Sequence, residues 1–116
     1  MFVKSTMKDG KRSLRIDLGH LLGMDNPEDA HVTFRELTVG EALGWRTESK
    51  NGEESLAEYC RKIFPDVIIE HDLYKTPEEK MSSKEAVDFL WEKFSTTVAL
   101  TEEVSRFNFF ILKPKR

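Results

Sequence analysis

Alternation of apolar and polar residues near the N-terminus predicts a β-hairpin. Every second residue from 14 to 18 is leucine or isoleucine, which is the period of a half-buried strand. Residues 2–7 precede it as a partner strand, and Asp9-Gly10 between the two runs favours the positive φ of a tight turn. A third strand is expected at 32–37.

Residues 19–30 are rich in glycine, aspartate, asparagine and proline, which predicts a loop. A strand-to-helix junction follows further along the chain. Thr38-Val39-Gly40-Glu41 has the pattern of a capping box, in which the threonine hydroxyl and the glutamate carboxylate each accept from the other residue's backbone N–H. This pattern predicts a helix over about 39–47.

A second helix is predicted from a single apolar face. Its side chains recur at i, i+3, i+4, i+7 and i+8: Leu56, Tyr59, Cys60, Ile63 and Phe64. Asn51 or Ser55 is expected to cap this helix. Pro65 is expected to end it, because the residue before proline is pushed out of the helical region.

The next stretch gives conflicting signals. The β-branched residues of 66–70 favour a strand, whereas the four-residue spacing of Ile69 and Leu73 favours a helix, and we expect the helix. Thr76-Pro77-Glu78-Glu79 has a threonine cap and a proline at the first helical position, so it predicts a helix start.

The C-terminal third is expected to be helical as well. Ser82 and Glu85 form another capping box. The helix that follows carries four large apolar residues in phase: Val87, Leu90, Trp91 and Phe94. Thr101 restarts a helix to about Phe110, or else the alternating phenylalanines of 107–111 form a strand; the pattern allows both.

Strands therefore precede helices, which favours the α+β class: a small N-terminal antiparallel β-hairpin or sheet followed by a mainly helical body. The length of 116 residues suits one domain. Within the single domain 1–116 we expect 1–37 to be mainly β, 38–112 mainly helical, and 113–116 to be a basic tail.

Charge and hydropathy exclude several classes of partner. The net charge is −3, and the basic side chains concentrate in the two ends, so the body 17–112 is acidic and repels phosphates. No apolar run approaches the roughly 18 residues of a spanning helix, and residues 1–4 do not open a signal sequence. We therefore expect no nucleic acid, no membrane and a cytoplasmic location.

Candidate chemistry is sparse. No two of His20, His31 and His71 have the spacing of metal ligands. Adjacent side chains within Glu70-His71-Asp72 point apart on a helix or a strand. Cys60 lies on the apolar face of its helix, where a cysteine is usually a small hydrophobic residue. No glycine loop for phosphate and no nucleophile motif occurs. We therefore expect neither an enzyme nor a cofactor or metal site.

Aromatic side chains are the remaining candidates for function. One interpretation is core packing. The other is a surface that meets a partner, because exposed phenyl and indole rings are costly in water unless they are covered. The residues proposed as partner contacts are Trp91, Phe94, Phe107, Phe109 and Phe110.

The segment 34–41, Phe-Arg-Glu-Leu-Thr-Val-Gly-Glu, resembles an element of small tail assembly chaperones from long-tailed, siphovirus-type phages and prophages. In that family a short N-terminal β segment leads through an R-E-x-T-x-G-[D/E] turn into an acidic, mainly helical body. Arg35, Glu36, Thr38, Gly40 and Glu41 fit the turn.

The resemblance implies a non-enzymatic role in virion assembly. Members bind the tape measure protein and keep it soluble while the tail tube protein polymerises around it. They are often made in two forms by a translational frameshift, and they can form homo-oligomers. The alternative is a small cytoplasmic binding, adaptor or inhibitor protein that acts through an aromatic helix surface.

Overall fold

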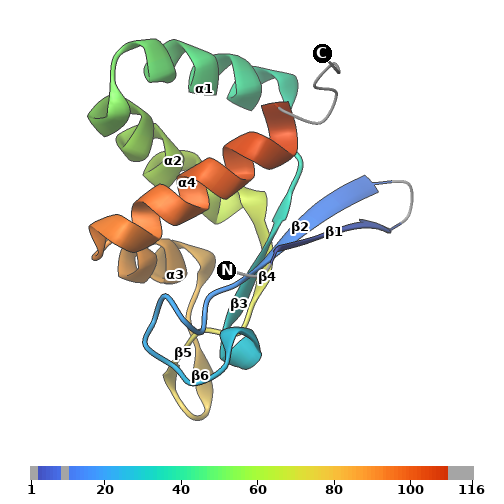
Figure 1. The fold of residues 1–116 in the computed structure, drawn as a ribbon, viewed down its shortest axis with the longest axis vertical. Coiled ribbons are helices and arrows are strands. Elements are labelled where there is room, and N and C mark those ends of the chain that lie inside the picture. Colours follow the sequence, from blue (N-terminus) through green and yellow to red (C-terminus); the bar gives the residue numbers. More distant parts are fainter. Residues whose placement is uncertain (1–2, 9–10, 110–116) are drawn as a thin grey trace.

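The computed structural model describes residues 3–8 and 11–109, with side chains from Arg12 onward. The α+β layout predicted from the sequence is confirmed (Figure 1). The strands are β1 (Val3–Lys8), β2 (Lys11–Asp17), β3 (His31–Arg35), β4 (Ile68–His71), β5 (Tyr74–Thr76) and β6 (Glu79–Lys80). The helices are α1 (Val39–Lys50), α2 (Glu53–Val67), α3 (Ser83–Leu90) and α4 (Phe94–Phe109), with a 3₁₀ turn at Pro27–Asp29.

The main sheet has the strand order β1-β2-β3-β4, and every pair in it is antiparallel. The predicted hairpin is confirmed, with Val3 opposite Ile16, while the Asp9-Gly10 turn lies outside the described residues. The fourth strand, β4, comes from beyond α2. Strands and helices are therefore not fully segregated along the chain, because the edge strand β4 comes from the mainly helical part.

Helix α2 packs against α1, α3, α4 and β4, and α4 crosses it (Figure 1). Phe64 of α2 is fully buried at this junction. Its ring centroid lies 4.9 Å from that of Phe34 on β3 and 5.3 Å from that of Trp91 after α3. Trp45 of α1 approaches to 6.1 Å. Pairs of aromatic rings at these separations attract each other in addition to burying area.

The junction between β3 and α1 has the predicted capping box. The backbone N–H of Thr38 donates to Glu41 Oε1 over 2.8 Å, and the Glu41 N–H donates to Thr38 Oγ1 over 3.2 Å. Arg35 adds a two-pronged contact to the same carboxylate, over 2.9 and 3.0 Å. Asn108 Oδ1 accepts from the Leu37 N–H, which ties this junction to the last turn of α4.

Two expectations for α2 are wrong. Gly52, with φ of 113°, is the N-cap in place of Asn51 or Ser55, since glycine adopts this angle without strain. Helix α2 also continues through Pro65 to Val67. Pro65 has no N–H to donate to the Arg61 carbonyl, yet the helical hydrogen bonding resumes after it, because the Ile68 N–H reaches the Phe64 carbonyl.

The helix expected for the stretch after α2 is wrong as well. Residues 68–71 form β4, where their β-branched side chains and the open edge of β3 outweigh the four-residue spacing. At Thr76 the hydroxyl accepts from the Glu79 N–H over 3.1 Å, as a cap would. The chain nevertheless turns there between β5 and β6, because the same local hydrogen bond serves a turn equally well.

The C-terminal helices have different boundaries from those predicted. Helix α3 begins after its Ser82 capping box as expected, but it ends at Leu90. Phe94 is therefore the first residue of α4 and does not share the face of Val87 and Leu90. Helix α4 then runs without a break through Thr101, so the strand alternative for the alternating phenylalanines is wrong up to residue 109.

Truncation of the central ring should destabilise the protein. We expect Phe64→Ala to cost about 3–5 kcal/mol in the free energy of unfolding and to lower Tm by roughly 10 °C or more, because a fully buried ring leaves a cavity. Phe94→Ala is the matched control, since that ring is 78% exposed. Thermal unfolding followed by circular dichroism measures both. An equal loss from both variants would contradict this packing.

The clamp at the junction should make stability depend on pH. The hydrogen bonds from Arg35 lower the pKa of Glu41, so their stabilisation is complete above the usual glutamate pKa and disappears as the pH falls through the lowered one. Glu41→Gln keeps a capping-box residue but removes the charge. We expect a loss of about 1 kcal/mol at neutral pH and a shallower decline of Tm with acid. Glu78→Gln, at an exposed turn, is the control that removes the same charge away from the clamp.

Candidate functional site

The aromatic residues proposed as partner contacts do not form one surface. Phe94 projects from the first turn of α4 and is 78% exposed. Phe107 is buried, and the Arg12 guanidinium carbon lies 4.2 Å from the centre of its ring. Phe109 is half-buried, 6.0 Å from Trp45 between ring centroids. Phe110 lies outside the described residues.

Trp91 has a supporting position. Its ring meets Phe64 edge-on, and its Nε1–H donates to the Ala57 carbonyl of α2 over 3.1 Å. The indole thus contacts the inner side of α2 and holds that helix in place. Only Phe94, among the four that the structure describes, is largely free to contact another molecule.

A groove opens beside Phe94, between the N-terminal half of α2 and α4. Its volume is about 500 Å³. The floor is formed by small and apolar side chains of both helices: Leu56, Ala57, Thr97, Val98 and Thr101. Phe94 stands at one end of it. Within residues 3–8 and 11–109, only α2 and α4 line the groove, and its floor is largely apolar.

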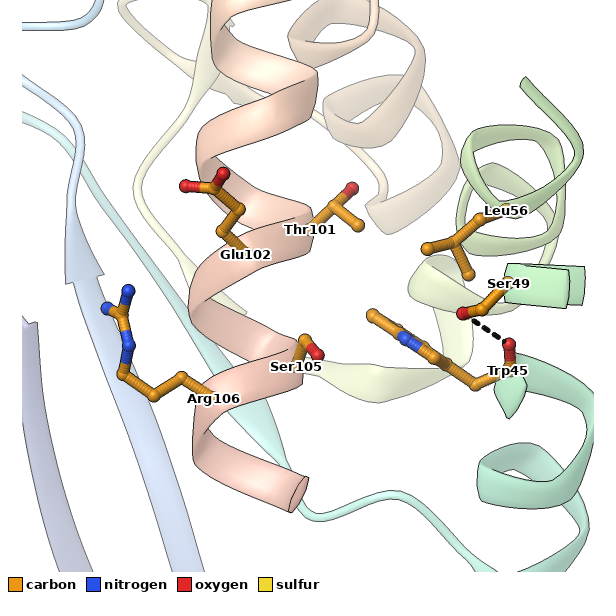
Figure 2. Close-up of a pocket in the computed structure, with 7 residues that line it drawn as sticks. All are labelled: Trp45, Ser49, Leu56, Thr101, Glu102, Ser105 and Arg106. Atoms are coloured by element: carbon orange, nitrogen blue, oxygen red, sulfur yellow. Dashed lines mark hydrogen bonds between the residues drawn. The ribbon is translucent and has the colours of Figure 1, made fainter. Parts of the chain in front are cut away.

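The groove continues along α4 into a second hollow of about 330 Å³, which shares Leu56, Thr101 and Glu102 with the first. In Figure 2, Trp45 of α1 and Leu56 of α2 face Thr101 and Ser105 of α4 across this space. The Ser49 hydroxyl, also on α1, donates to the Trp45 carbonyl over 2.8 Å (Figure 2), so it is already satisfied by the protein.

One face of α4 lines both hollows. Its residues recur at i, i+3, i+4, i+7, i+8, i+11 and i+12: Phe94, Thr97, Val98, Thr101, Glu102, Ser105 and Arg106. This is the period of a helix face that packs against another helix. Thr97, Val98 and Thr101 are small, so a partner helix could approach closely along their part of the face.

Sequence reasoning missed this face. The predicted break before Thr101 divided the small residues of α4 between two elements, so their common period was hidden. An uninterrupted helix from Phe94 would have revealed it, because Thr97, Val98 and Thr101 follow at helical spacing.

Carboxylates stand on both walls of the groove. Glu53 and Glu54 come from the first turn of α2, and Glu102 comes from the middle of α4. Within the described part of the chain, none of the three forms an ion pair. Arg106, which is at the far end, is held by Glu103 over 2.8 Å. Among the described residues, the lining of the first hollow therefore contains three carboxylates and no cation, while Arg106 lines the second hollow together with Glu102.

The side chains of His31 and His71 contact other residues of the protein. His31 on β3 places Nδ1 3.0 Å from Asp72 and Nε2 3.3 Å from Glu70, a meeting that the antiparallel pairing of β3 and β4 creates. His71 points inward, burial lowers its pKa, and its Nδ1 accepts from the Leu73 N–H over 3.0 Å. Over residues 3–8 and 11–109, no group of three ligand-type side chains is arranged to hold a metal ion.

Comparisons of the chain with protein-family models, with curated proteins and with solved structures find no match. Of the helices in the described residues, none has the length and hydropathy needed to cross a bilayer.

Cys60 should be inert towards thiol reagents in the folded protein. It is fully buried, and this desolvation raises its pKa to about 12, so the reactive thiolate is scarce at neutral pH. We expect labelling by a water-soluble maleimide to be about tenfold or more slower than in denaturant. Mass spectrometry of timed samples measures the rate. Rapid labelling under native conditions would show that the face of α2 bearing Cys60 opens to solvent.

Proposed function

We propose that this protein is a tail assembly chaperone of a long-tailed phage or prophage, which binds the tape measure protein in the host cytoplasm and keeps it soluble. The observation that carries the proposal is the uncovered groove between α2 and α4, with the exposed Phe94 ring at its end. The resemblance of segment 34–41 to such chaperones supplies the identity of the partner.

The groove suits a helix in its shape and lining. An amphipathic helix is commonly bound by laying its apolar face into a hydrophobic groove, with anchors at i, i+3, i+4 and i+7. A tape measure protein is a long helical rod whose apolar stripes are exposed until the tube encloses them. Val98 and Leu56 offer such a stripe an apolar floor.

The junction that resembles the family has a structural part in this proposal. Arg35 and Glu41 fix the start of α1, and the Tyr59 hydroxyl of α2 donates to the Glu41 carbonyl over 3.1 Å. A Cβ at Gly44 would clash with the Tyr59 ring, so α1 and α2 pack closely there. The motif thereby sets the position of α2, which forms one wall of the groove.

Co-expression with the tape measure protein of the same phage or prophage tests the proposal. We expect the unmodified chain to bring the tape measure protein into the soluble fraction and to elute with it in size exclusion. Phe94→Ser should return most of it to the pellet, because that ring is exposed and is the anchor at the end of the groove. Tyr74→Ser is the matched control, since Tyr74 is 52% exposed on β5, outside the groove.

A tape measure protein that stays insoluble beside the folded, unmodified chain would overturn the proposal. It would leave the groove to an adaptor or inhibitor role with a different partner. Soluble capture that Phe94→Ser does not reduce would also count against it, because the complex would then form through another surface.

A further inference from the structure

We infer that the groove selects a helix whose apolar stripe is flanked by lysine or arginine. The inference rests on one part of the proposed function, which is that a partner helix occupies this groove. It specifies the chemistry of that helix. It follows from the carboxylates on the rim and from the length of the open face of α4.

The acidic groups lie on opposite walls. Glu53 and Glu54 belong to α2, Glu102 belongs to α4, and the apolar floor with Val98 lies between them. A helix seated on that floor would have a carboxylate along each of its flanks. Cations at those flanks would be attracted, whereas acidic flanks would bring like charges together at the edge of an apolar surface, which is costly.

Glu102 is the informative member of the three. Acidic residues in a first turn stabilise the helix N-terminus, so Glu53 and Glu54 have a local role in α2. Glu102 lies in the middle of α4, where the helix dipole has no such effect. It is exposed and, among the described residues, it pairs with no cation. Its charge is thus available to a partner.

The length of the face sets the length of the partner segment. The lining of α4 extends from Phe94 to Arg106, which corresponds to about 18 Å at the rise of an α-helix. A docked helix of about three turns would cover it. Such a helix would place apolar side chains at i, i+3, i+4 and i+7 on the floor. Its basic side chains would lie beside Glu53, Glu54 and Glu102, and none would lie beside Arg106.

A small-molecule ligand fits the lining less well. Pockets for such ligands combine enclosure with a few converging polar groups that fix the ligand's orientation. Here the Thr97 hydroxyl donates to the Lys93 carbonyl just before α4, and that of Ser49 is bonded within α1. Of the buried hydroxyls that line the groove in the described residues, only Thr101 Oγ1 has no partner. The carboxylates stand on separate walls of the groove.

Two fluorescent peptides of about 14 residues test the inference against the full-length protein. Both have the same leucine stripe and the same helical content, and one has lysines on the flanks where the other has glutamates. We expect fluorescence anisotropy to show at least about tenfold tighter binding of the lysine peptide at low salt. The preference should shrink as salt is raised, because the rim is exposed.

Variants assign the selectivity to the rim. Glu102→Gln should weaken binding of the lysine peptide about threefold, and Glu102→Lys should weaken it further while improving binding of the glutamate peptide. Glutamine and lysine are good helix formers, so the Tm of both variants should stay close to that of the unmodified protein. Glu78→Gln, on the β5–β6 turn, is the control that removes the same charge elsewhere.

The outcomes separate this inference from the proposed function. Equal binding of the two peptides, or binding that ignores Glu102, overturns the inference but leaves a helix-binding groove. Absence of binding by either peptide, together with capture of the tape measure protein that depends on Phe94, also overturns it, because the partner then has another chemistry. Lysine selectivity without capture of a tape measure protein supports the inference and overturns the proposed identity of the partner.

Discussion

Burial of the Phe64 ring is the interaction on which the arrangement of the helices depends. The ring lies where the sheet, α1 and the residues after α3 meet, and each of these contributes an aromatic partner: Phe34, Trp45 and Trp91. Because rings pack at restricted separations and angles, this contact fixes α2 relative to everything around it. The hydrogen bond from Trp91 to the Ala57 carbonyl holds the same helix about two turns earlier.

The groove is a consequence of that arrangement. Helix α4 buries Leu100, Val104 and Phe107, while its Phe94-to-Arg106 face lines the two hollows. The N-terminal half of α2 lies opposite this face of α4, and the groove is the space between them. Of the rings that sequence reasoning had assigned to a partner, Trp91, Phe107 and Phe109 pack in or against the core.

Charge determines which amphipathic helices the groove is expected to favour. An apolar groove alone would accept many amphipathic helices, since burial of apolar area is not directional. Carboxylates on opposite walls discriminate between helices by their flanks, at little cost to the fold, because exposed charges contribute little to stability. The same reasoning explains why Cys60 and His71, which are both buried, have no comparable role: their surroundings suppress the charged forms.

Local signals in the sequence determined the hairpin, the two capping boxes and the apolar face of α2, because each depends on neighbours within a few residues. The bonds made by Thr38 and Ser82 are examples. Only tertiary structure decided that 68–71 would be a strand, since an edge of β3 had to be available, and that Thr76 would begin a turn of a hairpin. The groove belongs to this second class. Its walls lie about 45 residues apart in the chain, so no local pattern of apolar and polar positions records that they face each other.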